Sequence, residues 1–127
     1  MAKKDFASEW KNKQALGRMI IQCRCGMSQR KLAKAIGIPP SNLTYIENGV
    51  NVPSPDVYAK IIKVLNPTIE EHMEMDKLYS TIRNVPPPDV CEVILNHDGL
   101  GNTLKLLTGK TLTKQDIKRI ETLFCSF

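Results

Sequence analysis

Apolar residues recur along the first half of the chain with the spacing of short amphipathic helices. Leu16, Ile20 and Cys23 are spaced i, i+4 and i+7, and further apolar stripes follow. This spacing places the apolar side chains on one face of a helix. The further stripes are Leu32, Ala33 and Ile36; Leu43 and Ile46; and Val57, Ile61, Ile62, Val64 and Leu65. The pattern predicts four short helices before residue 66.

Helix-boundary residues fall between these stripes. Ser28 is placed to cap the second helix at its N-terminus, and Gly37 follows its last apolar residue. Pro39-Pro40 opens the third helix and Gly49 ends it. Ser54-Pro55-Asp56 combines an N-cap, a proline and an acid at the start of the fourth.

The second half has fewer clear boundaries. Thr68 and Glu71 have capping-box spacing and precede an apolar stripe. That stripe is formed by Ile69, Met73, Tyr79 and Ile82. Residues 89–110 are open to two interpretations, namely helices or a β-hairpin that pairs Val90–Leu95 with Thr103–Leu107. Helices are favoured. Thr113 and Asp116 then begin a terminal amphipathic helix, whose apolar face is Ile117, Ile120, Leu123, Phe124 and Phe127.

Composition limits the classes of protein to consider. The chain has 127 residues, 42% hydrophobic and 24% charged, which is typical of one globular domain, or of one small domain with an appendage. No window offers the ~20 apolar residues of a membrane span, and residues 1–5 are not followed by the apolar segment of a signal peptide. We therefore expect a cytoplasmic protein with no membrane partner.

Metal, cofactor and enzyme chemistry are not predicted. The four cysteines include no CxxC pair, and neither His72 nor His97 has a ligand at zinc-finger spacing. His72 lies in an acid-rich segment, where a solvated helix face is the simpler interpretation. No nucleophile–base set, glycine-rich phosphate loop or carboxylate pair stands out. We expect no metal, no cofactor and no enzymatic activity.

The net charge of +5 is unevenly distributed. Residues 1–66 contain eleven basic and four acidic side chains, whereas residues 67–127 contain seven basic and nine acidic ones. A basic N-terminal half joined to a mildly acidic C-terminal half favours contact of one half with a polyanion. A solvated basic face with no partner explains the same charges, and charge alone does not separate the two interpretations.

The most informative segment is 27–49. Ala33 is small where two helices must approach closely, Gly37 permits a left-handed turn, and Leu43 and Ile46 pin the next helix to the core. The segment therefore has the pattern of two short helices held at a fixed angle. Such a unit exposes the first turn of its second helix, which fits the DNA major groove.

Residues 14–66 resemble the lambda-repressor-like, XRE-type helix-turn-helix family. The residues that carry the resemblance are Ser28-Gln29, Leu32-Ala33, Ile36-Gly37-Ile38, Ile46-Glu47-Asn48-Gly49 and Pro53. Upstream, Leu16-Gly17, Ile20 and Arg24 match the family's first helix only if about two residues are missing before Gly26. The resemblance implies an all-α fold, with a five-helix domain in residues 1–66 and a small helical extension in residues 67–127.

The resemblance also implies roles for particular residues. Residues 27–36 would be the scaffold helix and residues 40–47 the recognition helix. The implied base contacts are Pro40, Ser41, Thr44 and Tyr45. The implied phosphate contacts are Ser28, Gln29, Asn42, Asn48 and Asn51. Arg24 and Glu47 match a structural salt bridge between the first and third helices of relatives. Simpler roles stay open: an N-cap for Ser28, a supporting aromatic for Tyr45, and turn residues for Asn48 and Asn51.

Two functions are compatible with this pattern. The leading one is a sequence-specific transcription regulator of double-stranded DNA, expected to be a repressor of phage, prophage or mobile-element type. It would act as a homodimer on a palindromic operator and associate with the nucleoid. Its dimer or partner face would be the terminal stripe Ile117, Ile120, Leu123, Phe124 and Phe127. The alternative is an interaction protein on the same scaffold, an antitoxin or a host-factor inhibitor, whose residues 67–127 bind another protein.

Overall fold

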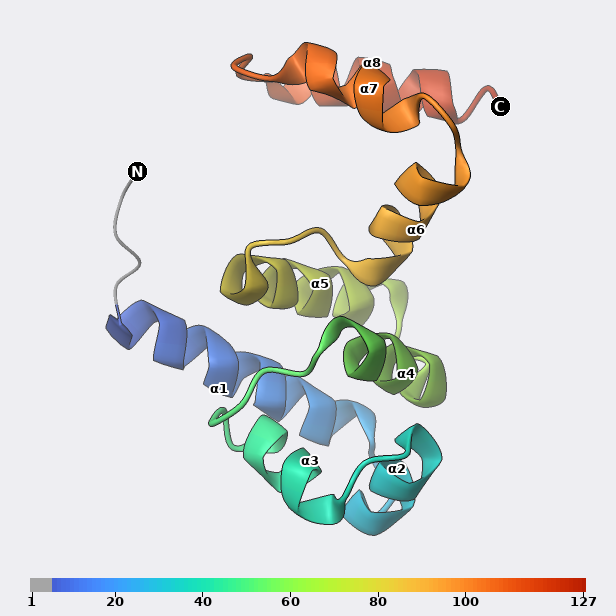
Figure 1. Ribbon diagram of the computed structural model, residues 1–127. Coiled ribbons are helices and arrows are strands. Elements are labelled where there is room, and N and C mark those ends of the chain that lie inside the picture. Colours follow the sequence, from blue (N-terminus) through green and yellow to red (C-terminus); the bar gives the residue numbers. More distant parts are fainter. Residues whose placement is uncertain (1–5) are drawn as a thin grey trace. The chain divides into compact units, whose positions relative to one another are not determined.

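The computed structural model describes residues 6–127 and contains only helices (Figure 1). No strand occurs within these residues, so the expected all-α class is confirmed. Residues 1–5, which entered the signal-peptide argument, lie outside the described part. The elements are α1 (Phe6–Cys23), α2 (Gln29–Ile36), α3 (Pro40–Glu47), α4 (Pro55–Leu65), α5 (Ile69–Arg83), α6 (Pro88–Asn96), α7 (Leu100–Leu104), the 3-10 helix η1 (Lys105–Leu107) and α8 (Lys114–Phe124).

The helix boundaries follow the local signals in the sequence. The Ser28 and Ser54 side chains accept hydrogen bonds from the backbone N–H groups of Lys31 and Val57, which caps α2 and α4. Gly37 ends α2 with φ of 76°, a left-handed conformation that glycine adopts without strain. Both predicted threonine caps, at the starts of α5 and α8, are complete capping boxes.

The β-hairpin alternative for residues 89–110 is wrong. This segment forms most of α6, all of α7 and η1, with a turn at residues 97–99. Pro88 stands in the first turn of α6, where its missing N–H group is tolerated, and Asp89 follows it. Gly99, with φ of 86°, reverses the chain into a second helix and not into a second strand.

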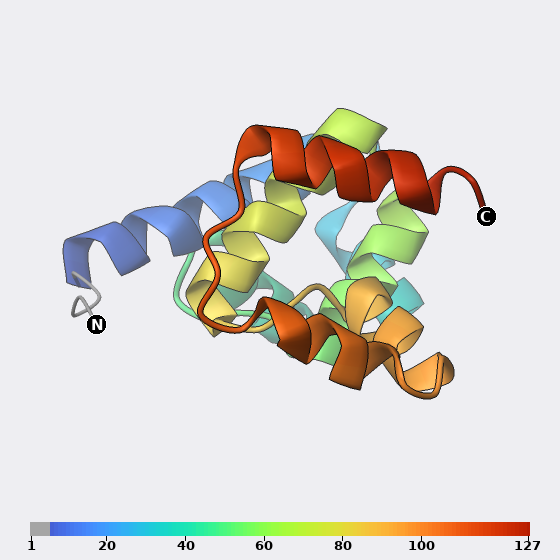
Figure 2. The same ribbon diagram turned by 90° about the horizontal axis from the view of Figure 1, so that it is seen from above.

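The core is formed by α1 to α5. Helix α1 packs on α5 and on α3, while α2 packs on α3 and α4; Figures 1 and 2 both show α1 running past α5. The buried side chains are Leu16, Ile20, Leu32, Ala33, Ile36, Leu43, Ile46, Tyr58, Ile61, Met75, Tyr79 and Ile82. Tyr58 of α4 stacks on Tyr79 of α5, with ring centroids 4.2 Å apart. Helix α5 therefore completes the core that the first four helices begin.

The chain divides into two compact units, which we call unit 1 (residues 1–92) and unit 2 (residues 93–127). We expected the five-helix domain to lie within residues 1–66, whereas the fifth helix is α5, which begins at Ile69. Of the predicted α5 stripe, Tyr79 and Ile82 are buried, but Ile69 and Met73 are exposed and Met75 is buried instead. The structural boundary thus comes after α5 because α5 packs on α1.

Unit 2 differs in its packing. All of its residues are described, and none of its side chains is buried. Helices α7 and α8 lie apart in Figure 2, joined by residues 108–113, and have little contact with each other. In the part of the chain that the structure covers, no helix is both long enough and apolar enough to pass through a lipid bilayer.

Candidate nucleic-acid interface

Helix α3 has one buried and one exposed face. Leu43, Ile46 and Glu47 point into unit 1 and are buried. The other face is formed by Pro40, Ser41, Thr44, Tyr45 and Asn48, of which all but the partly buried Thr44 are exposed. Tyr45 keeps 49% of its surface exposed. The four residues predicted to contact bases therefore share one outward face of α3.

A polar network fixes the angle between α2 and α3. Glu47 is buried, with a side-chain exposure of 3%, and its carboxylate lies 2.7 Å from Nε of Arg24. A second guanidinium nitrogen donates to Glu47 Oε1 at 3.2 Å, so the pair is bidentate. Arg24 also donates to the backbone carbonyl of Met27 at 3.1 Å, and Gln29 Nε2 donates to Glu47 Oε1 at 2.8 Å. The end of α1, the start of α2 and the end of α3 are thus tied to one carboxylate.

Gln29 and Thr44 extend the network toward the exposed face. The Thr44 hydroxyl lies 3.1 Å from Gln29 Oε1 and 3.0 Å from the Pro40 carbonyl, and its single proton serves one of them at a time. The Gln29 side-chain amide has two N–H groups, and one of them donates to Glu47. One Gln29 N–H group and the Thr44 hydroxyl oxygen therefore stay free for a ligand.

Two glycines let α1 cross α3 at close range. A Cβ atom on Gly17 would collide with the backbone carbonyl of Glu47, and one on Gly49 would lie 2.8 Å from the Gln14 backbone nitrogen. Gly49 also has φ of 78°, which disfavours other residues. These contacts hold the C-terminal end of α3 against α1, so the exposed face of α3 is carried by a rigid support.

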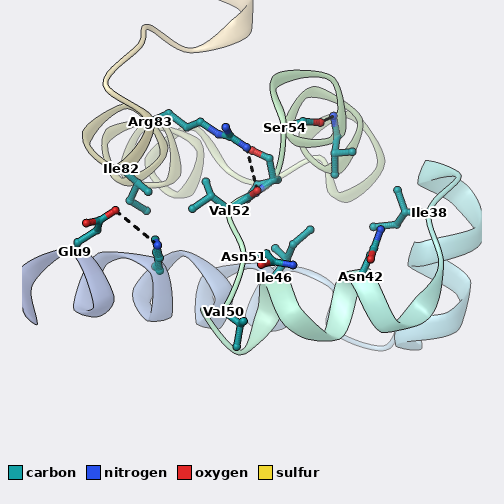
Figure 3. A pocket seen from close by; sticks show the side chains of 13 residues that line it. Glu9, Ile38, Asn42, Ile46, Val50, Asn51, Val52, Ser54, Ile82 and Arg83 are labelled. Carbon is teal, nitrogen blue, oxygen red and sulfur yellow. Dashed lines mark hydrogen bonds and ion pairs between the residues drawn. The ribbon is translucent and has the colours of Figure 1, made fainter. Parts of the chain in front are cut away.

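The predicted phosphate-binding residues lie in three places. Ser28 caps α2, and its neighbour Gln29 begins the helix whose free N–H groups suit an anion. Asn48 is the exposed C-terminal cap residue of α3. Asn42 and Asn51 lie apart from the outward face, on an open groove behind α3 (Figure 3). The structure thus separates Asn42 and Asn51 from the base-contact candidates.

This groove has a volume of about 610 Å³ and is bounded by α1, α3, α5 and the segment that follows α3. Arg83 of α5 donates from Nε to the Pro53 carbonyl at 3.1 Å, and from Nη2 to the Val52 carbonyl at 3.1 Å (Figure 3). Glu9 and Lys13 form an ion pair of 3.6 Å along its α1 wall. Arg83 therefore anchors the segment after α3, a role that the sequence did not indicate.

Comparison with protein families shows what the α2–α3 pair resembles. A family model described as helix-turn-helix, of the XRE or lambda-repressor-like type, matches residues 18–71. Residues 18–71 are therefore similar to the helix-turn-helix family. The match begins within α1 and ends in α5, so it covers the complete α2–α3 pair and its supports. A search of curated proteins and a search of solved structures each found no match.

The helix-turn-helix match relates the exposed face of α3 to DNA binding. The match supports a DNA-binding transcription regulator of the XRE type, a family that is typically non-enzymatic. In such domains the second helix of the pair enters the major groove. Helix α3 occupies that position here, with the same bounds, Pro40–Glu47, that the family resemblance implied.

Pro39 is an unusual start for the second helix of a helix-turn-helix domain. It stands at the N-cap position of α3 and makes no side-chain cap, and Pro40 follows as the first helical residue. Neither proline has a backbone N–H group to donate. These two positions therefore present carbon atoms where a serine or glutamine would present hydrogen-bonding groups.

Side-chain chemistry outside the helix-turn-helix face is limited. The thiol of Cys23 donates to Glu71 Oε2 at 3.4 Å, and burial together with this carboxylate raises the pKa of Cys23 to about 11. That thiol is therefore unreactive near neutral pH. His72, Asp76 and Asp89 form a cluster whose ligand-type atoms lie within 4.8 Å of one another. Sequence analysis missed this cluster, although the i, i+4 spacing of His72 and Asp76 was a usable signal.

The predicted dimer or partner face lies in unit 2. Ile117, Leu123, Phe124 and Phe127 are exposed by 49%, 56%, 55% and 91%, and Ile120 is partly buried. Phe124 and Phe127 are stacked at a centroid distance of 6.3 Å. Except for Phe127, which follows the helix, these residues lie on α8 at helical spacing. The structure thus exposes an apolar stripe along α8.

Proposed function

We propose that this protein is a sequence-specific transcription repressor that inserts α3 into the major groove of its operator. The observation that carries the proposal is the outward face of α3, which is held from behind by the Arg24–Glu47 pair and the glycine crossing. A rigid, exposed helix of eight residues offers side chains at defined positions without an ordering cost on binding. The family match to residues 18–71 supports the same assignment.

The side chains on α3 suggest how the operator is read. Pro40 makes only apolar contact, for which a thymine methyl group is the natural partner. Ser41 and Tyr45 are exposed and have hydroxyl groups for base edges, and the Thr44 oxygen can accept from cytosine or adenine amino groups. Because few donors are available, we infer that DNA shape contributes to specificity.

Phosphate contacts would supply most of the affinity. Ser28 and Gln29 are the proposed contacts at the start of α2, and Asn48 is the proposed contact after α3. Asn42 and Asn51 would reach the backbone only where it passes the groove side of the domain. Binding should weaken with salt, with a log–log slope of about −0.9 for each phosphate contacted.

Selection of bound duplexes from a random library tests the proposal and defines the operator. Fluorescence anisotropy against that operator and a scrambled duplex then compares the wild type with Ser41→Ala and Tyr45→Ala. Each substitution should reduce the preference for the operator by roughly 5- to 100-fold, as expected for a lost base contact. Ser8→Ala, an exposed serine on α1, is the matched control and should change nothing. Unchanged preference in both α3 variants contradicts the assignment.

We further propose that two copies of the chain act together through α8. One domain of this kind reads few base pairs, and two-fold dimers reach half-sites about one helical turn apart. Unit 2 has 35 residues and no buried side chain, and chains below about 40 residues rarely sustain a core alone. The apolar stripe of α8 gives a second copy the surface to supply the missing burial. A dimer on a palindrome that overlaps a promoter would block the polymerase sterically.

Neighbouring residues on α8 provide a matched test of this dimer. Leu123 is on the apolar stripe, whereas Thr122 is on the opposite side of the helix. Light scattering across a concentration series should give a dimer for the wild type and for Thr122→Asp. Leu123→Asp should shift the protein to monomer and shorten the protected operator by one half-site. A monomeric wild type, or a dimeric Leu123→Asp variant, contradicts the α8 interface.

Two observations favour the alternative, an interaction protein built on the helix-turn-helix scaffold. The prolines at the start of α3 remove donors from the position nearest the bases, while exposed apolar side chains gather in unit 2. An antitoxin or host-factor inhibitor would keep the scaffold and bind a protein through residues 67–127. Filter binding at two salt concentrations separates the two functions, because only a repressor retains sequence preference at the higher one.

A further inference from the structure

The second chemically distinctive place in unit 1 lies where α4, α5 and the start of α6 meet. His72 and Asp76 are one turn apart on α5, with His72 Nε2 3.4 Å from Asp76 Oδ1. Asp89 comes from the first turn of α6, and one ligand-type atom from each of the three residues lies within 4.8 Å of the others. Three side chains from two helices therefore converge on one point.

These side chains line a cavity of about 140 Å³. Glu92, from the next turn of α6, adds a third carboxylate to its wall, and Tyr58, Ala59, Ile62 and Pro88 form the remainder. No lysine or arginine lines the cavity. Because like charges repel one another, a bound cation would relieve the repulsion among these carboxylates.

Tyr58 orients one of the carboxylates from behind. Its side chain is buried, and its hydroxyl donates to Asp76 Oδ1 at 2.6 Å. A buried donor that holds a metal-binding carboxylate in place is the usual support for such a ligand.

We propose that His72, Asp76 and Asp89 bind a divalent first-row transition-metal cation, with Glu92 as a fourth ligand. An imidazole nitrogen together with carboxylate oxygens suits Mn²⁺ or Zn²⁺, whereas Ca²⁺ and Mg²⁺ prefer oxygen ligands alone. Atoms bound to one such cation lie roughly 3–4 Å apart, since each bond is about 2.1 Å long. The 4.8 Å limit of the cluster is wider than that, and the exposed Asp89 side chain, whose Oδ1 accepts from the Val90 N–H group at 2.9 Å, would have to turn toward α5 to complete the site.

The consequence of binding is mechanical. Asp89 and Glu92 belong to the last segment of unit 1, whereas His72 and Asp76 belong to its core helix α5. A cation between them joins that last segment to α5 and α4. The site uses none of the residues proposed to contact DNA, so metal binding and DNA binding are independently testable.

The two histidines of the chain allow a clean test on the full-length protein. His97 is exposed, and its Nδ1 lies 2.7 Å from the Val93 carbonyl, outside the cluster. Mn²⁺ is the paramagnetic probe, and as a hard cation it avoids the four thiols. Sub-stoichiometric Mn²⁺ should broaden the imidazole signals of His72 far more strongly than those of His97, which lies five residues beyond Glu92. Equal broadening of both rings, or of neither, overturns the proposal.

Calorimetric titration with Zn²⁺ measures the affinity of the same site. The wild type and His97→Gln should bind one equivalent with equal affinity, while His72→Gln should lose binding. Asp89→Asn, an exposed substitution that leaves the core intact, should weaken binding by about ten-fold or more. Zn²⁺ binding that survives both substitutions, or that is lost only when the cysteines are changed to serine, overturns the site.

Discussion

Unit 1 and unit 2 are both helical, yet they are stabilised in different ways. In unit 1, five helices share one core, and the only buried charged residue among the described ones, Glu47, is matched by Arg24 and Gln29. In unit 2, three short helices bury no side chain completely. In unit 2, α8 begins with a capping box, whereas α7 and η1 have no side-chain cap. A fixed tertiary arrangement needs burial, which only unit 1 provides.

The difference separates the two tasks proposed for the protein. A recognition helix must hold its side chains in fixed positions, and the Arg24–Glu47 network behind α3 does so. An association element must instead leave apolar surface exposed until a partner covers it. The exposed stripe on α8 is therefore what an association element requires, while the same stripe would weaken an isolated domain.

Amide hydrogen exchange should show the largest contrast between the units. Amides in the centres of α1, α4 and α5 should exchange through global unfolding, roughly a thousand-fold or more slower than those of α7 and α8 in dilute protein. At high concentration, protection should appear in α8 alone, because association covers it. Mass spectrometry of proteolytic fragments reads both effects. Equal, concentration-independent protection in α5 and α8 would contradict the comparison.

Breaking the buried ion pair should produce the largest loss of stability from a single substitution. Glu47→Ala leaves the guanidinium of Arg24, which is 21% exposed, and the Gln29 amide without their partner. We expect about 3–5 kcal/mol less free energy of unfolding by urea denaturation. Glu121→Ala, an exposed acid on α8, should change it by less than about 0.5 kcal/mol. Similar values for the two variants would mean that the network does not hold the domain together.

Glycine-to-alanine substitutions should have opposite effects on stability in the two units. Gly17→Ala forces α1 away from the Glu47 carbonyl, for which we expect a loss of about 1–3 kcal/mol. In α7, a Cβ atom on Gly101 would meet only Ile94 Cγ2 at 3.5 Å, an ordinary contact. Gly101→Ala should therefore raise helix content by removing a helix-breaking glycine, an effect of up to about 1 kcal/mol. Circular dichroism during thermal unfolding measures both variants.

Local chemistry explains how much of this could be predicted from the sequence. The proline start of α3 and the caps Ser28, Ser54 and Thr68 depend on neighbouring residues, so the sequence pattern predicted them. The Arg24–Glu47 pair was expected from family resemblance, not from periodicity. Its geometry depends on where α1 ends, at Cys23, one residue before Arg24.

The remaining features depend on long-range packing that no local pattern specifies. Only half of the stripe predicted on α5 is buried, because Met75 and not Met73 joins Tyr79 and Ile82 in the core. Arg83 reaches back thirty residues to Pro53, and Asp89 meets His72 only because α6 begins beside α5. The unit boundary after residue 92 follows from the same packing, since the Pro86–Pro88 break lies before and not at the division.

The smallest expected difference between the units concerns the capping boxes that begin α5 and α8. Hydrogen bonds from the backbone N–H groups of Thr68 and Thr113 hold the pKa values of Glu71 and Asp116 below their ordinary values of 4.5 and 3.8. Because both pKa values are lowered by folding, each carboxylate stabilises its helix above its unfolded pKa, and this stabilisation is lost as the pH falls through the folded pKa. Acidification from pH 5 to 2 should therefore unravel the first turn of α5 and of α8.

The two helix starts should respond differently to this loss, because only α5 is packed. Thr68→Ala should lower the free energy of unfolding of unit 1 by about 1 kcal/mol, whereas Thr113→Ala should reduce α8 helicity without moving the main unfolding transition. Circular dichroism and urea denaturation at pH 7 separate local from global effects. If Thr113→Ala shifted the main transition as far as Thr68→Ala, α8 would have to fold together with unit 1, and the two units would be a single cooperative structure.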